Sequence, residues 1–261
     1  MGRPSILSRG RAKLSRETKR AHLELLHRRC SGDLFVDYGW IRLLYSSDGD
    51  GQEIAYHQNQ AAWHEKDMHA FRSLLAPGQT AVDVGANMGF VTTMLASIVG
   101  HRGRVLAFEP SPTAFEKLKK TISANALSQV VPMNIGCGAA RATAKLHEVS
   151  QSSGNASIIG QGAASTEIHV ERLDDVPEAW ATPISLLKID TEGYEPEVLE
   201  GARRLIEEHR PTIYLEMGGD YLASTLRSID LLADAGYATD HVRSIDWSDV
   251  GNGSDYFFLP R

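Results

Sequence analysis

From residue 80 onward, short apolar segments alternate with longer segments of helical periodicity, and this alternation constrains the fold more than any other feature. Segments such as "TAVDVGA" and "ISLLKID" are almost uniformly apolar, which is typical of strands buried on both faces. Strands that alternate with helices build a parallel sheet with helices on both sides. We therefore predict an α/β fold with a doubly wound, mostly parallel sheet. Its seven expected strands lie at residues 80–86, 103–110, 130–136, 184–190, 211–217, 237–243 and 255–260.

Helical segments separate most of these strands. In one of them, Ser111 followed by Pro112 is a pair that favours a helix N-terminus. Residues 139–175 interrupt the alternation with polar and apolar stretches around a loop rich in Ser, Gly and Asn, which predicts a β-hairpin insertion. The expected helices lie at residues 58–76, 88–100, 111–127, 196–208 and 220–235.

The first thirty residues differ in composition from the rest, because they are rich in Arg and Lys and poor in Asp and Glu. Such a segment is typical of an organellar transit peptide, of an arm that binds nucleic acid, or of a solvated amphipathic helix, and its loose leucine stripe favours the helix. A further hypothesis is that this arm packs over a ligand site as a lid. We divide the chain into an N-terminal extension, residues 1–57, which also contains short strands, and a main domain, residues 58–261.

The overall composition is that of a soluble globular protein and excludes several classes of function. The formal net charge of −6 gives no electrostatic support for nucleic-acid binding. No apolar run reaches the length needed to span a membrane. Cys30 and Cys137 lie far apart, so we expect free thiols in a reducing, cytoplasmic compartment. The sequence leaves the oligomeric state open, with a homodimer as one option.

The loop "VDVGANMGF" follows the first strand of the alternation, and in doubly wound sheets ligands bind at the carboxyl ends of the strands. Gly85 and Gly89 allow the backbone to turn tightly and to approach a ligand. Glu109 ends the second strand, where a carboxylate can accept two hydrogen bonds from ribose hydroxyls. These features are common to folds that bind nicotinamide dinucleotides and folds that bind S-adenosylmethionine.

Two residues in this loop separate the two cofactors. Asn87 replaces the middle glycine of the G-x-G-x-x-G fingerprint that admits a pyrophosphate. Asp83 lies inside the strand, and we expect it to point toward the loop, where it would repel a pyrophosphate and attract the cationic methionyl part of S-adenosyl-L-methionine. The methyl donor is therefore favoured. A nicotinamide-dependent oxidoreductase and a plain α/β turn with a buried, satisfied Asp83 stay open as alternatives.

Four stretches, "VDVGANMGF", "FEP", "ERLDDV" and "KIDTEGYEPEVLEGA", resemble the FkbM-type methyltransferases in their order and spacing. The resemblance covers roughly residues 60–260, and residues 188–202 are its most specific part. It implies a class I, Rossmann-like, S-adenosylmethionine-dependent methyltransferase fold. It also implies methylation of hydroxyl groups on natural products, sugars or lipid-linked glycans.

The same resemblance implies the cofactor-binding residues. The methionyl side would be lined by Asp83, Gly85, Ala86, Asn87 and Gly89. Glu109 would hold the ribose, and Ile135, Gly136 and Cys137 would border the adenine.

Two carboxylates end neighbouring strands and are candidates for catalysis. Asp190 ends the fourth strand and Glu216 lies near the end of the fifth, so both could face one cleft. O-Methylation must place a hydroxyl oxygen about 3 Å from the sulfonium methyl and remove its proton. Asp190 is the first choice for this base, because a dry cleft can raise the pKa of a carboxylate. Glu216 would hold the acceptor or share the base function, and Glu192 would position the substrate or the cofactor amine, or cap a helix.

Other acids and histidines have simpler interpretations. Glu195 and Glu197 lie in the first turn of a helix, where acidic side chains interact favourably with the helix dipole, so we expect them to be structural. His64 and His241 are alternative bases that we expect to be surface or packing residues. The loop at residues 150–158 is either a wall of the substrate site or only the tip of the hairpin.

A magnesium ion is the alternative mechanism. Asp190 and Glu216 could be two of its ligands, but spacing in the sequence identifies no third, so we expect no metal.

Together these observations predict an S-adenosylmethionine-dependent O-methyltransferase that acts on a hydroxyl of a sugar, glycan or secondary metabolite. The alternatives are an N- or carboxyl-methyltransferase on the same fold, a Mg-dependent O-methyltransferase, a nicotinamide-dependent oxidoreductase and a non-catalytic binding module. No motif of the sequence identifies the acceptor molecule or the position on it that is methylated.

Overall fold

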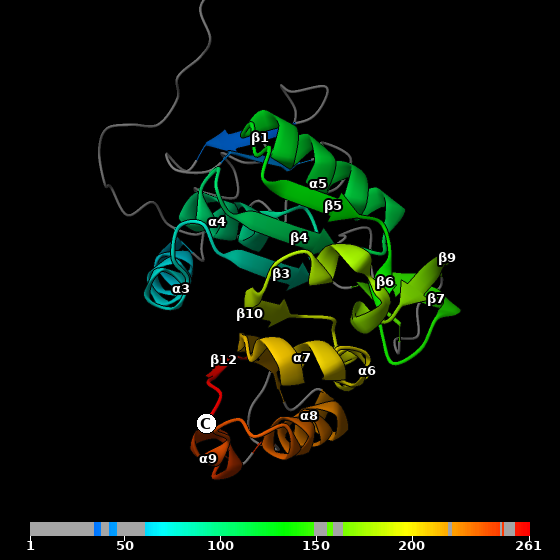
Figure 1. Cartoon of the computed structure of the whole chain (residues 1–261). Coiled ribbons are helices and arrows are strands. Elements are labelled where there is room, and N and C mark those ends of the chain that lie inside the picture. The colour runs from blue at the N-terminus through cyan, green and yellow to red at the C-terminus, as the bar shows by residue number, and fades with distance from the viewer. Residues whose placement is uncertain are drawn as a thin grey trace, which may run out of the picture.

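The computed structural model describes residues 34–37, 42–45, 61–148, 156–158, 164–218, 221–245, 247 and 254–261. Its centre is a six-stranded sheet with the order β12-β11-β10-β3-β4-β5, in which only β12 is antiparallel to its neighbour (Figure 1). This confirms the mostly parallel α/β fold. The strands are β3 (Thr80–Val84), β4 (Arg104–Phe108), β5 (Val130–Met133), β10 (Ile184–Ile189), β11 (Thr212–Met217) and β12 (Ser254–Phe258).

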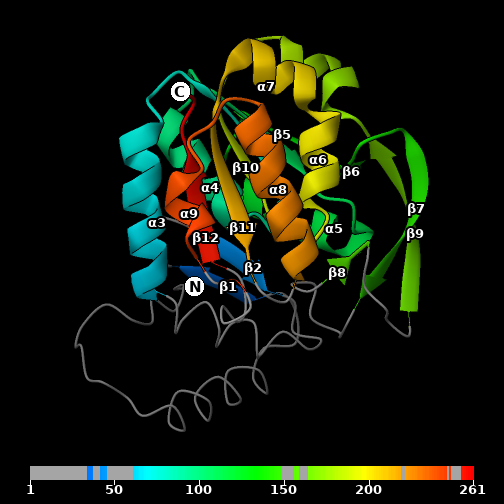
Figure 2. The same cartoon turned by 90° about the horizontal axis from the view of Figure 1, so that it is seen from below.

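Helices cover both faces of this sheet, as the alternation of strands and helices predicts. One face is covered by α3 (Ala61–Leu74), α4 (Phe90–Val99) and α5 (Pro112–Ala124), and the other by α6 (Glu195–Gly201), α7 (Arg203–His209) and α8 (Leu222–Asp234). Figure 2 shows α3 and α6 on opposite sides of the strands. Because side chains alternate along a strand, Val82 and Leu187 pack under α6 to α8, whereas Ala81 and Leu186 face α3 to α5.

The expected strand at residues 237–243 is wrong, and the central sheet of the described chain therefore has six strands rather than seven. Tyr237 makes an isolated antiparallel bridge with Pro260, and α9 (Asp240–Arg243) follows it. Tyr237 is buried and its hydroxyl donates a hydrogen bond to the Pro211 carbonyl. Tyr237 is buried and paired as a strand residue would be, but the chain enters α9 at Asp240, so the expected strand is reduced to this one bridge.

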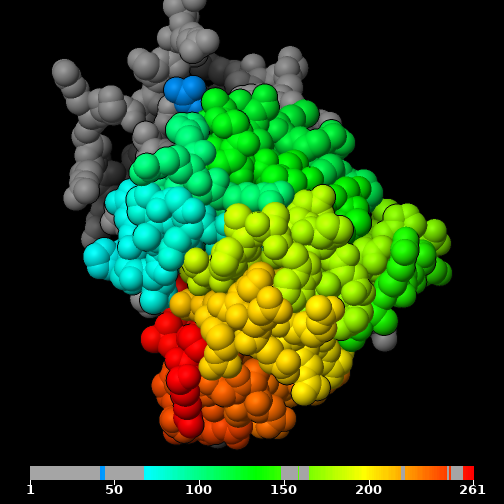
Figure 3. Space-filling view, viewed as in Figure 1, coloured from blue at the N-terminus to red at the C-terminus, as the bar shows by residue number. Residues whose placement is uncertain are grey.

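The predicted hairpin insertion is confirmed and is part of a second sheet with the order β6-β9-β7-β8. Its antiparallel core pairs β7 (Ala142–Glu148) with β9 (Ala164–Glu171), which protrude at the right of Figure 3, and β8 (Ala156–Ser157) pairs with β7. The third strand of the sequence pattern ends early, because residues 136–137 form β6 (Gly136–Cys137), which pairs in parallel with β9 instead of extending β5. The chain therefore leaves the central sheet after Met133.

Two short strands of the N-terminal extension are described, β1 (Leu34–Asp37) and β2 (Arg42–Tyr45), and they pair in antiparallel fashion. The backbone N–H of Arg42 donates to the side-chain oxygen of Asn125, at the end of α5. Leu43 is fully buried and belongs to the same core cluster as α3, α4 and α5. The hairpin therefore packs on the main domain. Residues 1–33, which include the basic arm and Cys30, lie outside the described residues.

A side-chain cap marks the beginning of α5. Ser111 caps α5 as predicted, because its hydroxyl accepts a hydrogen bond from the backbone N–H of Ala114.

The single helix expected at residues 196–208 is instead divided at Ala202 into α6 and α7. A 3₁₀ turn, η2 (Leu173–Asp175), carries Asp174, which lies at this break, and a second turn, η3 (Pro177–Trp180), follows. No helix in the described ranges is long and apolar enough to cross a bilayer.

Asp174 should be a main support of α7, because α7 has no capping side chain of its own. The buried Asp174 carboxylate accepts hydrogen bonds from the backbone N–H groups of Arg204 and Leu205, and from Arg172. We expect Asp174→Ala to lower the free energy of unfolding by about 2–3 kcal/mol in urea denaturation followed by circular dichroism.

Asp175→Ala is the matched control for this prediction. The Asp175 side chain is half exposed and lies 3.7 Å from Arg172, so its removal should change the free energy of unfolding by less than about 0.5 kcal/mol. Equal effects of the two substitutions would contradict a capping role for Asp174.

Candidate active site

The loop after β3 lies directly against the start of the turn that follows β10. Gly85 has a φ of +76°, and a Cβ built at this position would lie 1.8 Å from the backbone carbonyl oxygen of Asp190. The backbone N–H groups of Gly85 and Ala86 donate to the Phe108 carbonyl. Only glycine allows this approach, so Gly85 brings the predicted cofactor loop and the first-choice catalytic residue side by side.

A second glycine of the loop fits the helix behind it. Gly89 has a φ of +95°, and a Cβ there would lie 2.7 Å from a methyl group of Leu118 in α5. Gly89 therefore permits close packing of the loop on α5.

Glu109 follows β4, and its carboxylate anchors this loop. Glu109 Oε2 accepts a 2.7 Å hydrogen bond from the backbone N–H of Asn87, and Oε1 accepts one of 2.8 Å from that of Ser111. Burial raises the pKa of Glu109 to about 7, although both backbone donors act in the opposite direction. Each oxygen keeps a second lone pair, so the carboxylate still has the capacity to accept hydroxyl groups of a ribose.

Asn87 supplies the observation that points to a ligand at this loop. It has a φ of +47°, a left-handed conformation that is uncommon outside glycine. Its side-chain oxygen is buried and has no hydrogen-bond partner among the described residues. Buried polar atoms are rarely left unpaired, so this oxygen fits a donor from a ligand such as the ammonium of a methionyl group. The residues present therefore suit S-adenosylmethionine.

The three residues expected near the adenine have different environments. Ile135 is partly buried, whereas Gly136 and Cys137 are buried. The Cys137 thiol belongs to the main core cluster, and burial raises its pKa above its usual value. Cys137 is thus a packing residue, and only the Ile135 side chain remains partly accessible.

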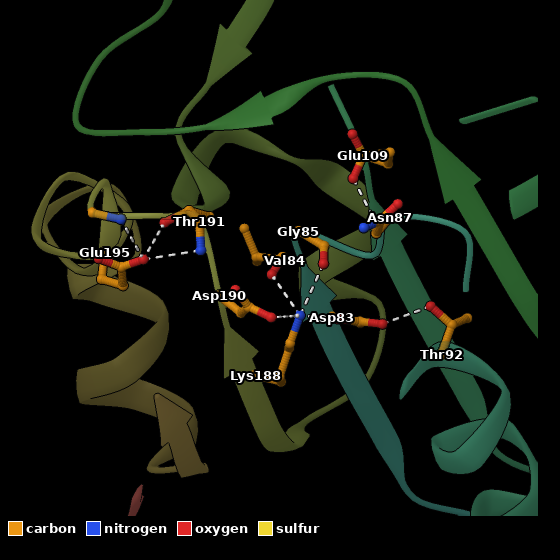
Figure 4. A network of polar contacts seen from close by, with 11 residues as sticks. Asp83, Val84, Gly85, Asn87, Thr92, Glu109, Lys188, Asp190, Thr191 and Glu195 are labelled. Atoms are coloured by element: carbon orange, nitrogen blue, oxygen red, sulfur yellow. Dashed lines mark hydrogen bonds and ion pairs between the residues drawn. The ribbon is translucent and has the colours of Figure 1, made fainter. Parts of the chain in front are cut away.

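A buried lysine at the centre of the site was missed by the sequence analysis (Figure 4). The Lys188 side chain is 3% exposed, and its Nζ lies 3.1 Å from Asp83 Oδ1 and 3.2 Å from Asp190 Oδ2. Nζ also donates to the carbonyl oxygens of Gly85, at 2.8 Å, and Val84, at 3.3 Å. Burial alone would lower the pKa of Lys188, but the charges of Asp190 and Asp83 raise it, so the ammonium stays charged. The sequence feature that could have revealed this residue is a lysine within the otherwise apolar run "ISLLKID".

This lysine changes the role expected of Asp83. The Asp83 carboxylate is fully buried, pairs with Lys188 and accepts a 2.6 Å hydrogen bond from the Thr92 hydroxyl of α4. It points at Lys188 and α4 rather than at the ligand loop. The expected attraction of the cationic methionyl group by Asp83 is therefore corrected, because Lys188 neutralises that charge.

The site contains a cluster of three carboxylates, from Asp190, Glu192 and Glu216. The sequence predicted that Asp190 and Glu216 would meet, because they end neighbouring strands. One carboxylate oxygen from each lies within 4.8 Å of the others. The charge of Asp190, with burial, raises the pKa of Glu216, which hydrogen-bonds to Asp190. Burial would also raise the pKa of Asp190, but Lys188 and the hydrogen bond from Glu216 bring it below its usual value. The pKa shifts of the two groups have opposite signs, so this pair favours a negative charge on Asp190 and a proton on Glu216.

Glu192 lies in a strained turn that Glu195 organises. Glu192 has a φ of +53° and Gly193 one of +98°. The Glu195 carboxylate accepts hydrogen bonds from the backbone N–H groups of Thr191 and Gly193 and from the Thr191 hydroxyl. Glu195 is thus structural, as expected.

The other predicted structural residues also have clear contacts. Glu197 forms an ion pair with Arg227, which joins α6 to α8. His241 is exposed and packs its ring near Phe258, at 5.3 Å between centroids. The side chain of His64 and most of the loop at residues 150–158 lie outside what the structure describes.

Comparison with known proteins identifies the family. The family model "Methyltransferase FkbM domain" matches residues 83–239, which is more than half of the chain. The chain belongs to the FkbM methyltransferase family. The match includes the glycine loop, Glu109, Lys188 and the three clustered carboxylates.

Curated relatives are similar over part of their length. Methyltransferase sdnD of Sordaria araneosa is 28% identical over 49% of this chain and 61% of its own length. Hexuronic acid methyltransferase AglP of Haloferax volcanii is 29% identical over 48% of this chain and 50% of its own length. The matched part of this chain thus spans about half to three fifths of these two relatives.

A solved structure shows the same fold. A Clostridium thermocellum protein assigned as an rRNA methylase has a TM-score of 0.50 and 14% identity, and covers 75% of this chain and 93% of its own. At this identity the likeness concerns the fold alone, and it confirms the class I methyltransferase fold of this FkbM-family chain.

Glu192 should make stability depend on pH. Burial and the charge of Asp190 raise the pKa of Glu192 from 4.5 to about 7. Between these values the unfolded chain ionises this group while the folded chain keeps the proton, so its contribution to the free energy of unfolding falls as pH rises. Glu192→Gln cannot ionise and can still accept the hydrogen bond from Tyr221. We expect it to raise Tm more at pH 8 than at pH 5.

Thermal unfolding at the two pH values checks this prediction, with the exposed Glu208→Gln as control. The control should shift Tm equally at both pH values. The same behaviour in Glu192→Gln would show that Glu192 ionises normally in the folded protein.

Proposed function

We propose that this chain is an S-adenosylmethionine-dependent O-methyltransferase whose acceptor is a hydroxyl group of a sugar, glycan or secondary metabolite. The observation that carries this proposal is the contact of the glycine loop with Asp190, a carboxylate that Lys188 keeps ionised. A cofactor loop and a proton acceptor thus lie side by side at the carboxyl ends of β3 and β10.

The cofactor supplies a methyl group on a positively charged sulfur. Asn87 would accept a hydrogen bond from the methionyl ammonium through its unpaired side-chain oxygen. Glu109 would accept the ribose hydroxyls while it holds the loop through the Asn87 backbone. These residues orient the methyl group and take no part in moving the proton.

Asp190 would remove the proton of the acceptor hydroxyl. Transfer of the methyl group to the hydroxyl oxygen would break the sulfur–methyl bond, leave neutral S-adenosylhomocysteine, and make the hydroxyl proton strongly acidic. A base of low proton affinity is then sufficient, provided that it is ionised and in place. The Asp190 side chain is 37% exposed, so it can reach an acceptor while Lys188 holds its other side.

Glu216 and Glu192 would position the acceptor. The raised pKa of Glu216 favours a protonated carboxyl group, which would donate a hydrogen bond to Asp190 and help to orient it. Glu192, which accepts a hydrogen bond from Tyr221, would receive a further hydroxyl of the acceptor.

The charge of the cluster favours a neutral acceptor. Asp190 and Glu192 would repel a carboxylate acceptor, and they would keep an amine acceptor protonated and therefore not nucleophilic. This supports hydroxyl over carboxyl and amine acceptors. By its name, the relative AglP acts on a hexuronic acid, which supports a carbohydrate as acceptor. Because a hexuronic acid carries both hydroxyl groups and a carboxyl group, this name does not bear on the choice between them.

A divalent cation is the second candidate for this cluster. The structure adds Glu192 as the third carboxylate that spacing in the sequence could not identify, and oxygens at this separation can bind Mg²⁺. In that mechanism a cation would orient and acidify the acceptor hydroxyl. The hydrogen bond between Glu216 and Asp190 favours a proton between these two groups instead. Activity in excess EDTA should therefore be unchanged, whereas a loss that Mg²⁺ restores would favour the metal.

Binding of S-adenosylhomocysteine tests the proposed cofactor. Isothermal titration should show micromolar affinity for the wild-type chain and none for NAD. Glu109→Ala should weaken this affinity at least about tenfold, because a buried acceptor of hydrogen bonds is lost. Glu116→Ala, on the exposed side of α5, is the control and should bind like the wild type. An absence of binding at millimolar ligand would exclude the proposal.

Turnover of Asp190→Asn tests the proposed base. The assay follows transfer of a labelled methyl group to a panel of neutral methyl glycosides and the corresponding uronic acids. We expect kcat to fall at least about a hundredfold, because a general base typically contributes that much, while affinity for S-adenosylhomocysteine changes little. Turnover like that of the wild type would remove Asp190 as base and would favour a carboxyl acceptor, which needs none.

A further inference from the structure

The Lys188 ammonium lies among four oxygen atoms of the protein. They are the Gly85 and Val84 carbonyl oxygens, Asp83 Oδ1 and Asp190 Oδ2, all within 3.3 Å. An ammonium has three protons to donate, so these contacts use its whole capacity. Because its side chain is also 3% exposed, Lys188 cannot donate to an acceptor molecule or exchange a proton with one. Any role in methyl transfer must act through the groups that it holds.

Those groups belong to both halves of the proposed site. Val84 and Gly85 begin the cofactor loop, and Asp190 is the proposed base. Burying a charge costs free energy, and the neighbouring Leu186 and Leu187 show that apolar residues fit this strand. A strand with only a packing role would not require an ammonium here.

Asp83 balances the charge without entering the site. Lys188 and Asp83 are direct neighbours across β10 and β3, and Thr92 holds the other carboxylate oxygen of Asp83. With Asp83 as a fixed counter-charge, the ammonium can hold Asp190 and the loop carbonyls at the same time.

We propose that Lys188 is a positioning residue that fixes the cofactor loop and the Asp190 carboxylate relative to each other, with Asp83 as its counter-charge. This inference rests on the proposed function and adds a residue that neither the sequence motifs nor the family match assigns to a role. Without the ammonium, the Gly85 carbonyl loses its donor and Asp190 Oδ2 loses its ion pair.

The test removes the lysine without leaving an unpaired buried charge. Lys188→Met alone would leave Asp83 buried without a cation and could unfold the chain. The comparison is therefore between Asp83→Asn and the double variant Asp83→Asn/Lys188→Met, in which both charges of the pair are absent. Isothermal titration with S-adenosylhomocysteine needs no acceptor. We expect the double variant to bind at least about tenfold more weakly than Asp83→Asn, with a Tm within a few degrees of it.

Equal affinity of these two folded variants would overturn the role of Lys188 and leave the proposed function intact. An absence of binding by the wild type would instead overturn the proposed function itself. Should the double variant not fold, Lys188→Arg replaces it and is compared with the wild type. The guanidinium of arginine keeps the charge, but its planar group cannot replace a single ammonium nitrogen that contacts all four oxygens. Lys188→Arg should bind at least about threefold more weakly, and unchanged affinity would overturn the inference.

A second readout tests whether Lys188 acts through Asp190. In the Asp83→Asn background, the Asp190→Asn substitution should lower kcat strongly. In the double variant, where Asp190 has lost its ion pair with Lys188, the same substitution should lower kcat much less, since residues that act as a unit have non-additive effects. Equal losses in both backgrounds would show that Asp190 is positioned independently of Lys188.

Discussion

The site depends on one buried cation. Lys188 contacts two carboxylates and two backbone carbonyls, and its side chain is almost entirely inaccessible. A buried charge is tolerated only when its partners are fixed, and here the register of β10 against β3 places Asp83 directly opposite Lys188. Asp190 lies two residues further along and so has its side chain on the same face of the sheet. The central sheet thus fixes the pair of Lys188 and Asp83, and the first residue after β10 adds Asp190.

The turns after β3 and β10 build the rest of the site through backbone contacts. At Gly85 the absence of a Cβ lets one turn rest on the Asp190 carbonyl of the other. Glu195 then holds the second turn through three hydrogen bonds, which stabilises the left-handed conformation of Glu192. Such strain persists only where the surroundings determine it, and it aims Glu192 toward Asp190 and Glu216.

The sequence predicted the five parallel strands. Strands buried on both faces are almost uniformly apolar, and the alternation with helices also indicated the partly buried edge strand β5. The sequence also predicted that Asp190 and Glu216 meet, since neighbouring parallel strands end at the same edge of a sheet. The strand at residues 237–243 was wrong, because a single buried aromatic, Tyr237, imitates the pattern of a strand. Lys188 was missed for a different reason: its partner Asp83 is distant in the chain, and only pairing of β3 with β10 makes the lysine a charge centre.

The same electrostatics determines both the protonation and the choice of acceptor. Burial would raise the pKa of Asp190, but Lys188 lowers it. The charge of Asp190, with burial, raises the pKa of Glu216, and burial, with the same charge, raises that of Glu192. The cluster therefore favours a negative charge on Asp190 and protons on Glu216 and Glu192. A neutral hydroxyl can approach such a cluster as a hydrogen-bond donor. A carboxylate acceptor would meet the Asp190 charge, and the buried Lys188, whose contacts all lie within the protein, offers it no ion pair. Lys188 keeps the proposed base, Asp190, ionised, and the negative charge of Asp190 in turn disfavours an anionic acceptor.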